Sequence, residues 1–216
     1  MIRLTGGSAR GRRISVHTAP GLRPTSDKVR QALFNLLAHR FSVELPALSA
    51  LDLFAGAGSL GLEALSRGAR HCTFVERDRR AIAALRASCA TLSFEPKAKL
   101  ICAPVERALG RLAAEPVAPP VSPQRQREWS PPYGLIFADP PYRDDLSGAV
   151  MERLLRCAPQ LTEDALLIFE SATQSAPEPV KGWLLEERRG YGDTTISFFC
   201  RDLSAEERDT STRSER

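Results

Sequence analysis

From residue 50 onward the chain alternates between short apolar runs and longer runs with helical periodicity, and no other feature constrains the fold as strongly. Strands are predicted at 51–54, 72–76, 99–102, 133–138 and 165–169, and helices at 60–67, 79–92 and 146–158. Such alternation is typical of βαβ units, which build a parallel sheet covered by helices on both faces. Two last apolar runs, 183–188 and 194–200, flank a glycine-containing turn and predict an antiparallel hairpin at the sheet edge. The sequence therefore predicts an α/β fold with a doubly wound, mostly parallel sheet.

The residues before this alternation predict two further elements. Short apolar stretches broken by glycines at 2–16 suit a β-hairpin that presents Arg10, Arg12 and Arg13. A hydroxyl cap at 24–26 then precedes a helix. The apolar residues of that helix recur at the spacing of one face, at Val29, Ala32, Leu33, Leu36 and Leu37. We expect this helix to pack on the sheet.

At 216 residues the chain is long enough for one catalytic domain but short for two. We divide it into a hairpin extension at 1–20, a domain at 21–203 and a tail at 204–216. The tail has almost no apolar residues and is expected to be disordered. Prolines recur throughout 115–132 and exclude a helix or a central strand there, which predicts an inserted surface loop.

Positive charge is concentrated at the amino-terminal end. The first forty residues hold eight Lys or Arg and one Asp, a net +7, so the remainder carries −3 of the chain's +4. A basic end on a mildly acidic body indicates electrostatic capture of phosphates. A solvated basic arm is the alternative.

Neither a metal nor a membrane is indicated. The five cysteines have no CxxC spacing and the three histidines lie far apart, so reduced, mostly buried thiols are expected and no metal site. The opening residues do not resemble a signal peptide, and no apolar stretch approaches the roughly 18 residues that span a bilayer. We expect a soluble, cytoplasmic protein, by default a monomer.

A glycine-rich turn, Gly56-x-Gly58-x-x-Gly61, lies between the strand predicted at 51–54 and the helix after it. Such a turn lets the backbone approach a ligand at the helix N-terminus. Asp52 would repel a pyrophosphate, but it suits S-adenosylmethionine, which carries an ammonium and a sulfonium and no phosphate. Glu76, which ends the next strand, is placed to accept hydrogen bonds from ribose hydroxyls. A tight turn in which Asp52 only caps the helix is the alternative.

A second motif, Asp139-Pro140-Pro141-Tyr142, follows the strand predicted at 133–138. An exocyclic amine on a nucleobase is a poor nucleophile because its lone pair is delocalised into the ring, so orientation must dominate its methylation. Asp139 and the Pro140 carbonyl can accept the two amine hydrogens, and Tyr142 offers a face on which the base can stack. In doubly wound sheets ligands bind beyond the carboxyl ends of the strands where the strand order reverses, so both motifs are expected to face one crevice.

The two motifs together resemble the amino-methyltransferases of nucleic acids, and the whole frame resembles the bacterial 16S rRNA guanine-N2 methyltransferase family. The resemblance covers nearly the whole chain and includes further segments at 6–13, 22–35, 60–69, 75–78 and 191–194. It departs from the family pattern at Gln31, where a Glu is expected, and in the length of the proline-rich insertion.

This resemblance implies a Rossmann-like, seven-stranded methyltransferase fold with an N-terminal hairpin. It also implies S-adenosylmethionine as cofactor and, as substrate, a guanine of small-subunit ribosomal RNA within an assembled or assembling particle. The implied catalytic residues are Asp139, Pro140 and Tyr142, and the implied RNA-binding residues are Arg10, Arg12, Arg13 and Arg23. The implied cofactor-binding residues are Thr25 in a lid, Asp52, Phe54, Gly56 and Gly58 toward the methionine, Glu76 at the ribose, and Arg77 and Ala103 at the adenine.

Three alternatives stay open. A DNA adenine-N6 methyltransferase shares the acid-proline-proline-aromatic motif, but the chain has no separate target-recognition domain. A dinucleotide oxidoreductase is disfavoured by Asp52 and by the second motif. A non-catalytic RNA-binding assembly factor is disfavoured by the intact segment 139–142.

Overall fold

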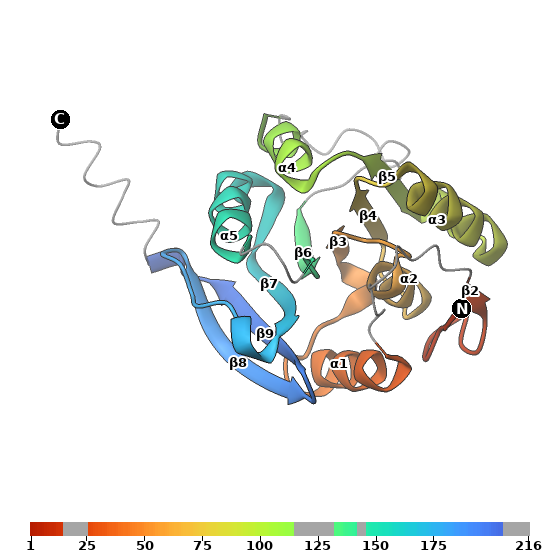
Figure 1. Cartoon of the computed structure of the whole chain (residues 1–216), viewed down its shortest axis with the longest axis horizontal. Helices are drawn as coiled ribbons and strands as arrows, with labels where there is room; N and C mark the ends of the chain where they lie inside the picture. The colour runs from red at the N-terminus through yellow and green to blue at the C-terminus, as the bar shows by residue number, and fades with distance from the viewer. Residues whose placement is uncertain (15–25, 115–131, 142–145, 205–216) are drawn as a thin grey trace.

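A seven-stranded sheet forms the centre of the protein in the computed structural model, which describes residues 1–14, 26–114, 132–141 and 146–204 (Figure 1). The strand order is β5-β4-β3-β6-β7-β9-β8. The strands are β3 (Ser49–Leu53), β4 (His71–Glu76), β5 (Ala98–Cys102), β6 (Tyr133–Ala138), β7 (Leu161–Ala172), β8 (Trp183–Tyr191) and β9 (Thr194–Arg201). Strands β3 to β7 are parallel, whereas β9 pairs antiparallel with β7 and β8 antiparallel with β9. The expected α/β class with a mostly parallel sheet is confirmed.

Helices cover both faces of this sheet, as Figure 1 shows. On one face lie α1 (Asp27–His39), α2 (Ser59–Ser66) and α3 (Arg79–Leu92), and on the other α4 (Val105–Ala114) and α5 (Ser147–Arg156). Each face buries its own apolar cluster. Short 3-10 turns lie at η1 (Leu45–Ala47), η2 (Glu95–Lys97), η4 (Ala158–Gln160) and η5 (Thr173–Ser175). Strands buried on both faces explain why the central runs are almost continuously apolar.

Two elements differ from the sequence expectations. Helix α4 was not predicted, although Val105, Ala108, Leu109 and Leu112 repeat at helical spacing and are buried. Strand β7 is longer than the predicted 165–169, because pairing with both β6 and β9 continues the strand beyond its apolar centre. The proline-rich insertion at 115–131 and the tail at 205–216 lie outside the described residues.

The N-terminal hairpin consists of β1 (Ile2–Arg3) and β2 (Arg13–Ile14), which pair antiparallel as expected. Its apolar residues, Ile2, Leu4, Ala9 and Ile14, are buried in the same cluster as α1 and α2. The described part of the hairpin therefore shares the core of the domain.

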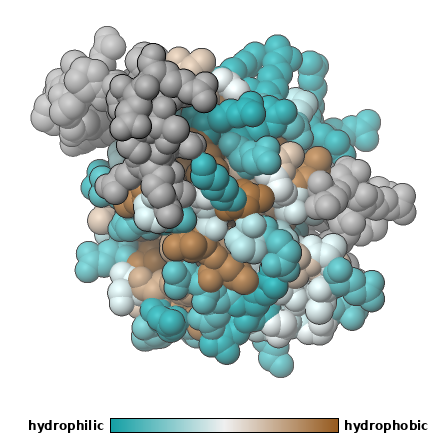
Figure 2. Space-filling view, turned by 90° about the vertical axis from the view of Figure 1, so that its left-hand side faces the viewer, coloured by the Kyte–Doolittle hydropathy of each residue, from teal (hydrophilic) through white to brown (hydrophobic). Residues whose placement is uncertain are grey.

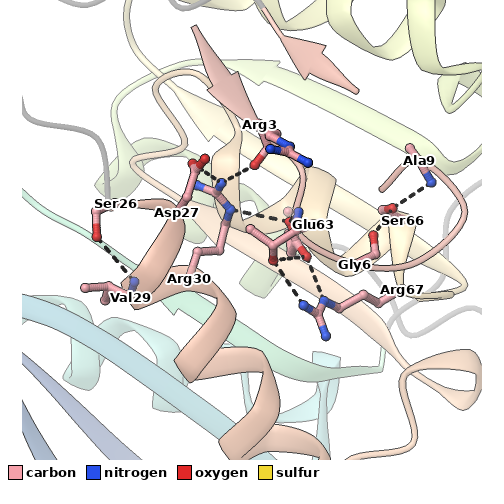
Figure 3. Close-up of polar contacts among 12 residues, drawn as sticks. Arg3, Gly6, Ala9, Ser26, Asp27, Val29, Arg30, Glu63, Ser66 and Arg67 are labelled. Atoms are coloured by element: carbon pink, nitrogen blue, oxygen red, sulfur yellow. Dashed lines mark hydrogen bonds and ion pairs between the residues drawn. The ribbon is translucent and has the colours of Figure 1, made fainter. Parts of the chain in front are cut away.

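A buried group of charges holds the hairpin and α1 against α2 (Figure 3). We call it the Glu63 cluster: Glu63, Arg30, Arg67 and Thr5. Both oxygens of the fully buried Glu63 accept hydrogen bonds, Oε2 from the Thr5 N–H at 2.8 Å and Oε1 from the Thr5 hydroxyl at 2.7 Å and from Arg67 Nε at 2.7 Å. Arg30, also fully buried, pairs with Glu63 at 3.4 Å and with Asp27 at 2.7 Å. Arg30 is one of the eight basic residues in the first forty. Because its charge is neutralised inside the fold, it does not contribute to the basic surface expected at this end.

Figure 2 shows the face on the left of Figure 1, where a mostly hydrophilic surface is interrupted by small hydrophobic areas. Among the described residues the exposed large apolar side chains are Met1, Leu184 and Leu203. Leu184 lies on the edge strand β8, where less exposed and more exposed residues alternate from Trp183 to Arg188.

Candidate functional site

Four carboxylates lie toward the carboxyl ends of four adjacent strands of the sheet. We call this group, Asp52, Glu76, Asp139 and Glu170, the acidic edge. The register pairs Asp52 with Phe74 on β4 and with Phe137 on β6, and pairs Phe137 with Ile168 on β7. Since side chains two residues apart in a strand share a face, all four carboxylates project toward the face that α1, α2 and α3 cover. They flank the junction of β3 and β6, where the strand order reverses.

Asp52 ends up under the first turn of α2. Its Oδ2 accepts a hydrogen bond from the Gly61 N–H at 2.9 Å, and its side chain is buried. Burial raises the pKa of Asp52 from 3.8 to about 7; the Gly61 hydrogen bond lowers it and the nearby Glu76 charge raises it. Asp52 therefore does cap the helix, as the alternative to cofactor binding holds, and its carboxyl also sits at an energetic cost that a cationic ligand would relieve.

The turn after β3 adopts a conformation that few side chains tolerate. Phe54 has φ of 60°, Gly56 of 52° and Gly58 of 75°. Strain at a non-glycine residue such as Phe54 persists where the surroundings impose it, which is common at ligand sites. A Cβ on Gly58 would lie 2.4 Å from Leu85 Cδ1, so α3 packs directly on this turn. A Cβ on Gly56 would meet only the Phe54 carbonyl oxygen, at 3.9 Å, so Gly56 is much less crowded than Gly58.

Glu76 holds this turn to the end of β4. Its Oε2 accepts from the Gly56 N–H at 2.9 Å and its Oε1 from the Asp78 N–H at 2.8 Å. A carboxylate oxygen can accept more than one hydrogen bond, so both oxygens keep capacity for ribose hydroxyls. The Ala103 N–H donates to the Glu76 carbonyl at 3.0 Å. Glu76, the exposed Arg77 and the buried Ala103 are therefore together at the ends of β4 and β5.

Asp139 follows the last residue of β6 and is half-buried, and Pro140 next to it is buried. Burial raises the pKa of Asp139 well above its ordinary value, and the neighbouring Glu170 and Asp52 raise it further. Among the residues that the structure describes, the charges that shift the pKa of Asp52 and Asp139 are all carboxylates. An edge with this excess of negative charge fits a cationic ligand such as S-adenosylmethionine. Tyr142 and Thr25 lie outside the described residues.

Glu170 is a member of the acidic edge that the sequence analysis missed. It is buried on β7 beside the position of Asp139, one residue beyond the register pair of Ala138 and Phe169. A signal was present, because Glu170 follows the strand predicted at 165–169 just as Asp139 follows the strand at 133–138. What the sequence could not supply was the pairing of these two strands.

The hairpin arginines lie away from the acidic edge. Arg10, Arg12 and Arg13 are exposed, and Arg12 Nη2 donates to the Thr91 carbonyl in the last turn of α3 at 2.9 Å. Both α2 and α3 begin near the carboxyl ends of the strands and run back toward the amino ends, so this contact places the arginines at the opposite edge of the sheet. Arg23 lies outside the described residues.

Two negative findings hold for the described ranges. In residues 1–14, 26–114, 132–141 and 146–204, no three His, Cys, Asp or Glu side chains gather into a group that could hold a metal ion. No helix in that same part of the chain is long and apolar enough to cross a membrane.

Comparisons of the sequence and of the structure with known proteins identify one family. The model of the conserved hypothetical protein 95 family matches residues 2–200. Ribosomal RNA small subunit methyltransferase D of Escherichia coli (strain K12) is 35% identical over 206 residues, 95% of this chain and 92% of the relative. The solved structure of the Escherichia coli protein yhhF is 33% identical, with a TM-score of 0.72 over 93% of this chain and 98% of that one. SMU.776, solved in complex with SAH, is 14% identical with a TM-score of 0.55 over 83% of this chain and 50% of that one, which shows the fold alone.

Proposed function

The chain belongs to the conserved hypothetical protein 95 family, which includes the ribosomal RNA small subunit methyltransferases D, and from this premise we propose that it methylates the exocyclic N2 of a guanine in small-subunit ribosomal RNA. The proposed methyl donor is S-adenosylmethionine, and the proposed substrate is an assembled or assembling small subunit. The observation that carries the proposal is the acidic edge, where Asp52 and Asp139 come together from β3 and β6.

The proposed cofactor site spans β3 to β5. Asp52 and the turn at Gly56 would hold the methionine end, with the Asp52 carboxylate facing the ammonium. Glu76 would accept the ribose hydroxyls, and Arg77 and Ala103 would flank the adenine. When bound, the cofactor supplies an electrophilic methyl group on a cationic sulfur. Its positive charge would offset the mutual repulsion of the acidic edge, so the ligand and the site match in charge.

The proposed catalytic contribution of the chain is orientation. Asp139 and the Pro140 carbonyl would accept the two hydrogens of the guanine amine, which turns the nitrogen lone pair toward the methyl group. The nitrogen forms a bond to the methyl carbon while the carbon–sulfur bond breaks and its electron pair stays on sulfur. The methylated nitrogen is then cationic and releases a proton, for which the ionised Asp139 is the nearest proposed acceptor.

The test is transfer of labelled methyl from S-adenosylmethionine to small ribosomal subunits that lack their native guanine-N2 methylation, followed by nucleoside analysis. We expect N2-methylguanosine with the wild-type protein. Asp139→Ala should lower the turnover at least about 10³-fold, because its hydrogen bond acts in the transition state, and leave cofactor affinity largely unchanged. The matched control is Asp164→Ala, an exposed aspartate near the start of β7, which should keep wild-type turnover.

Three results would each contradict a different part of the proposed function. Label in another nucleoside, or in DNA alone, would overturn the substrate while keeping the reaction class and would favour the adenine-N6 alternative. Wild-type turnover in Asp139→Ala would overturn the role of Asp139. Binding of small subunits without any methyl transfer would favour a non-catalytic assembly factor.

A further inference from the structure

The N-terminal hairpin lies far from Asp139. Its contacts are to the second half of α2, at Glu63 and Ser66, and to Thr91 at the end of α3. Helix α3 has 14 residues and therefore spans about 21 Å at 1.5 Å per residue. An RNA that contacts the hairpin and also reaches Asp139 must cross this length of protein surface.

The outer face of α3 covers the same length. The helix buries one side against the sheet, with Ala81, Ile82, Leu85, Ser88, Cys89 and Leu92. Its exposed side carries Arg79, Arg80 and Arg86, together with exposed alanines at 83, 87 and 90. Arg79 and Arg86 are seven residues apart and lie two turns from one another on one face. The helix begins after Asp78, at the edge of the sheet that holds the proposed cofactor site, and its last turn contains Thr91, which Arg12 of the hairpin contacts. Figure 1 shows the hairpin near one end of α3.

The charge of this face is uncompensated along the helix. Helix α3 has three arginines and no acidic residue. Among the residues that the structure describes, Arg79, Arg80 and Arg86 take part in none of the ion pairs found. The arginines of β8 differ, since Arg188 pairs with Glu178 and Arg189 with Glu187. A line of unpaired guanidinium groups with small side chains between them suits close approach of a phosphate backbone.

We propose that the outer face of α3 is an RNA-binding track that contacts successive phosphates of the substrate RNA. The track would connect the hairpin arginines with the edge of the sheet that holds the proposed cofactor site. This inference rests on the proposed RNA substrate. It assigns Arg79, Arg80 and Arg86 to phosphate contacts that carry no sequence information and that position the RNA. Arg77 is left out of the track because it belongs to the proposed adenine site.

The test compares two variants that remove the same charge from opposite faces. The track variant is Arg79→Gln, Arg80→Gln, Arg86→Gln, in which glutamine keeps helix propensity. The control variant is Arg107→Gln, Arg111→Gln, Arg156→Gln, three exposed arginines on α4 and α5. Binding to small ribosomal subunits is measured across a salt series, together with cofactor affinity and methyl transfer under single-turnover conditions.

We expect the slope of log affinity against log salt to become shallower by about 2 in the track variant, since each phosphate contact contributes roughly 0.7 to 0.9. The subunit concentration for half-maximal rate should rise at least about tenfold, with an unchanged maximal rate and unchanged cofactor affinity. The control variant should match the wild type in slope. A hairpin variant, Arg10→Ala with Arg13→Ala, should also reduce the slope, and its loss should add to that of the track.

An unchanged slope in the track variant would overturn the inference, and so would an equal loss in the control variant, which would make net charge the cause. A track variant with a lower maximal rate at saturating subunits would also overturn it, because the face would then act in catalysis or folding. If the wild-type protein neither binds nor methylates small subunits, the proposed function itself fails, which is a distinct result.

Discussion

The protein holds carboxylates in two places with opposite surroundings. In the Glu63 cluster, one carboxylate accepts from two arginines and from Thr5. In the acidic edge, burial and neighbouring carboxylates raise the pKa of Asp52 and of Asp139. In the first arrangement arginines compensate the carboxylate, whereas in the second burial and neighbouring carboxylates disfavour ionisation, which a cationic ligand would favour. The difference separates the part of the molecule that stabilises the fold from the part that is prepared for binding.

Removing the Glu63 charge should have the largest effect. Glu63→Gln leaves the buried Arg30 with less compensation, and breaking a buried pair in this way costs about 3–5 kcal/mol. For a protein of this size the melting temperature should fall by roughly 10 °C. The matched control is Glu187→Gln, which also loses contacts to two arginines, the exposed Arg40 and Arg189. Glu187 is half-buried, but both arginines are exposed and can turn to solvent, so we expect about 1 kcal/mol or less. Equal melting temperatures for the two variants would contradict the distinction.

Asp52→Asn should have an intermediate effect of opposite sign on stability. The folded-state pKa of Asp52, about 7, lies above the ordinary 3.8, so the folded protein holds a proton that the unfolded chain releases between about pH 4 and pH 7. Stability without cofactor therefore falls as the pH rises through this window, by up to a few kcal/mol at about 1.4 kcal/mol per pKa unit.

The asparagine variant should lose that dependence and unfold at a higher temperature than the wild type at pH 8, while its affinity for S-adenosylmethionine falls about tenfold or more. Thermal unfolding at pH 5 and pH 8, with calorimetric cofactor titration, measures both effects. A variant that is destabilised at pH 8 would show that Asp52 belongs with the structural carboxylates.

Glu170→Gln should have the smallest effect. Burial holds the pKa of Asp139 well above its ordinary value, and the neighbouring charges of Glu170 on β7 and Asp52 on β3 raise it further. If the ionised Asp139 is active, turnover falls as the pH drops through that raised pKa. Removing the Glu170 charge lowers the pKa of Asp139, so the acidic limb of the pH–rate profile should move toward lower pH. Glu163→Gln, an exposed glutamate on the same strand, is the control. A shift in both variants, or in neither, would remove Glu170 from the acidic edge.

The sequence by itself determined the fold class, the turn at Gly56 to Gly61 and the position of Asp139 after a buried strand. These follow from local periodicity, since apolar runs and glycine spacing show where strands end and helices begin. Helix α4 was readable by the same rule, because its apolar spacing is regular. Local periodicity is therefore sufficient to predict α4 as well.

Only the tertiary structure decided which charges meet. Arg30 looked like one member of a basic end, yet it is buried against Glu63, 33 residues further along the chain. Glu170 joins Asp139 because β6 and β7 pair in a particular register, and the hairpin arginines lie at the far edge because α2 and α3 run antiparallel to the strands. Pairing, burial and the sign of nearby charge depend on contacts between distant residues, and residue type and local spacing do not encode them.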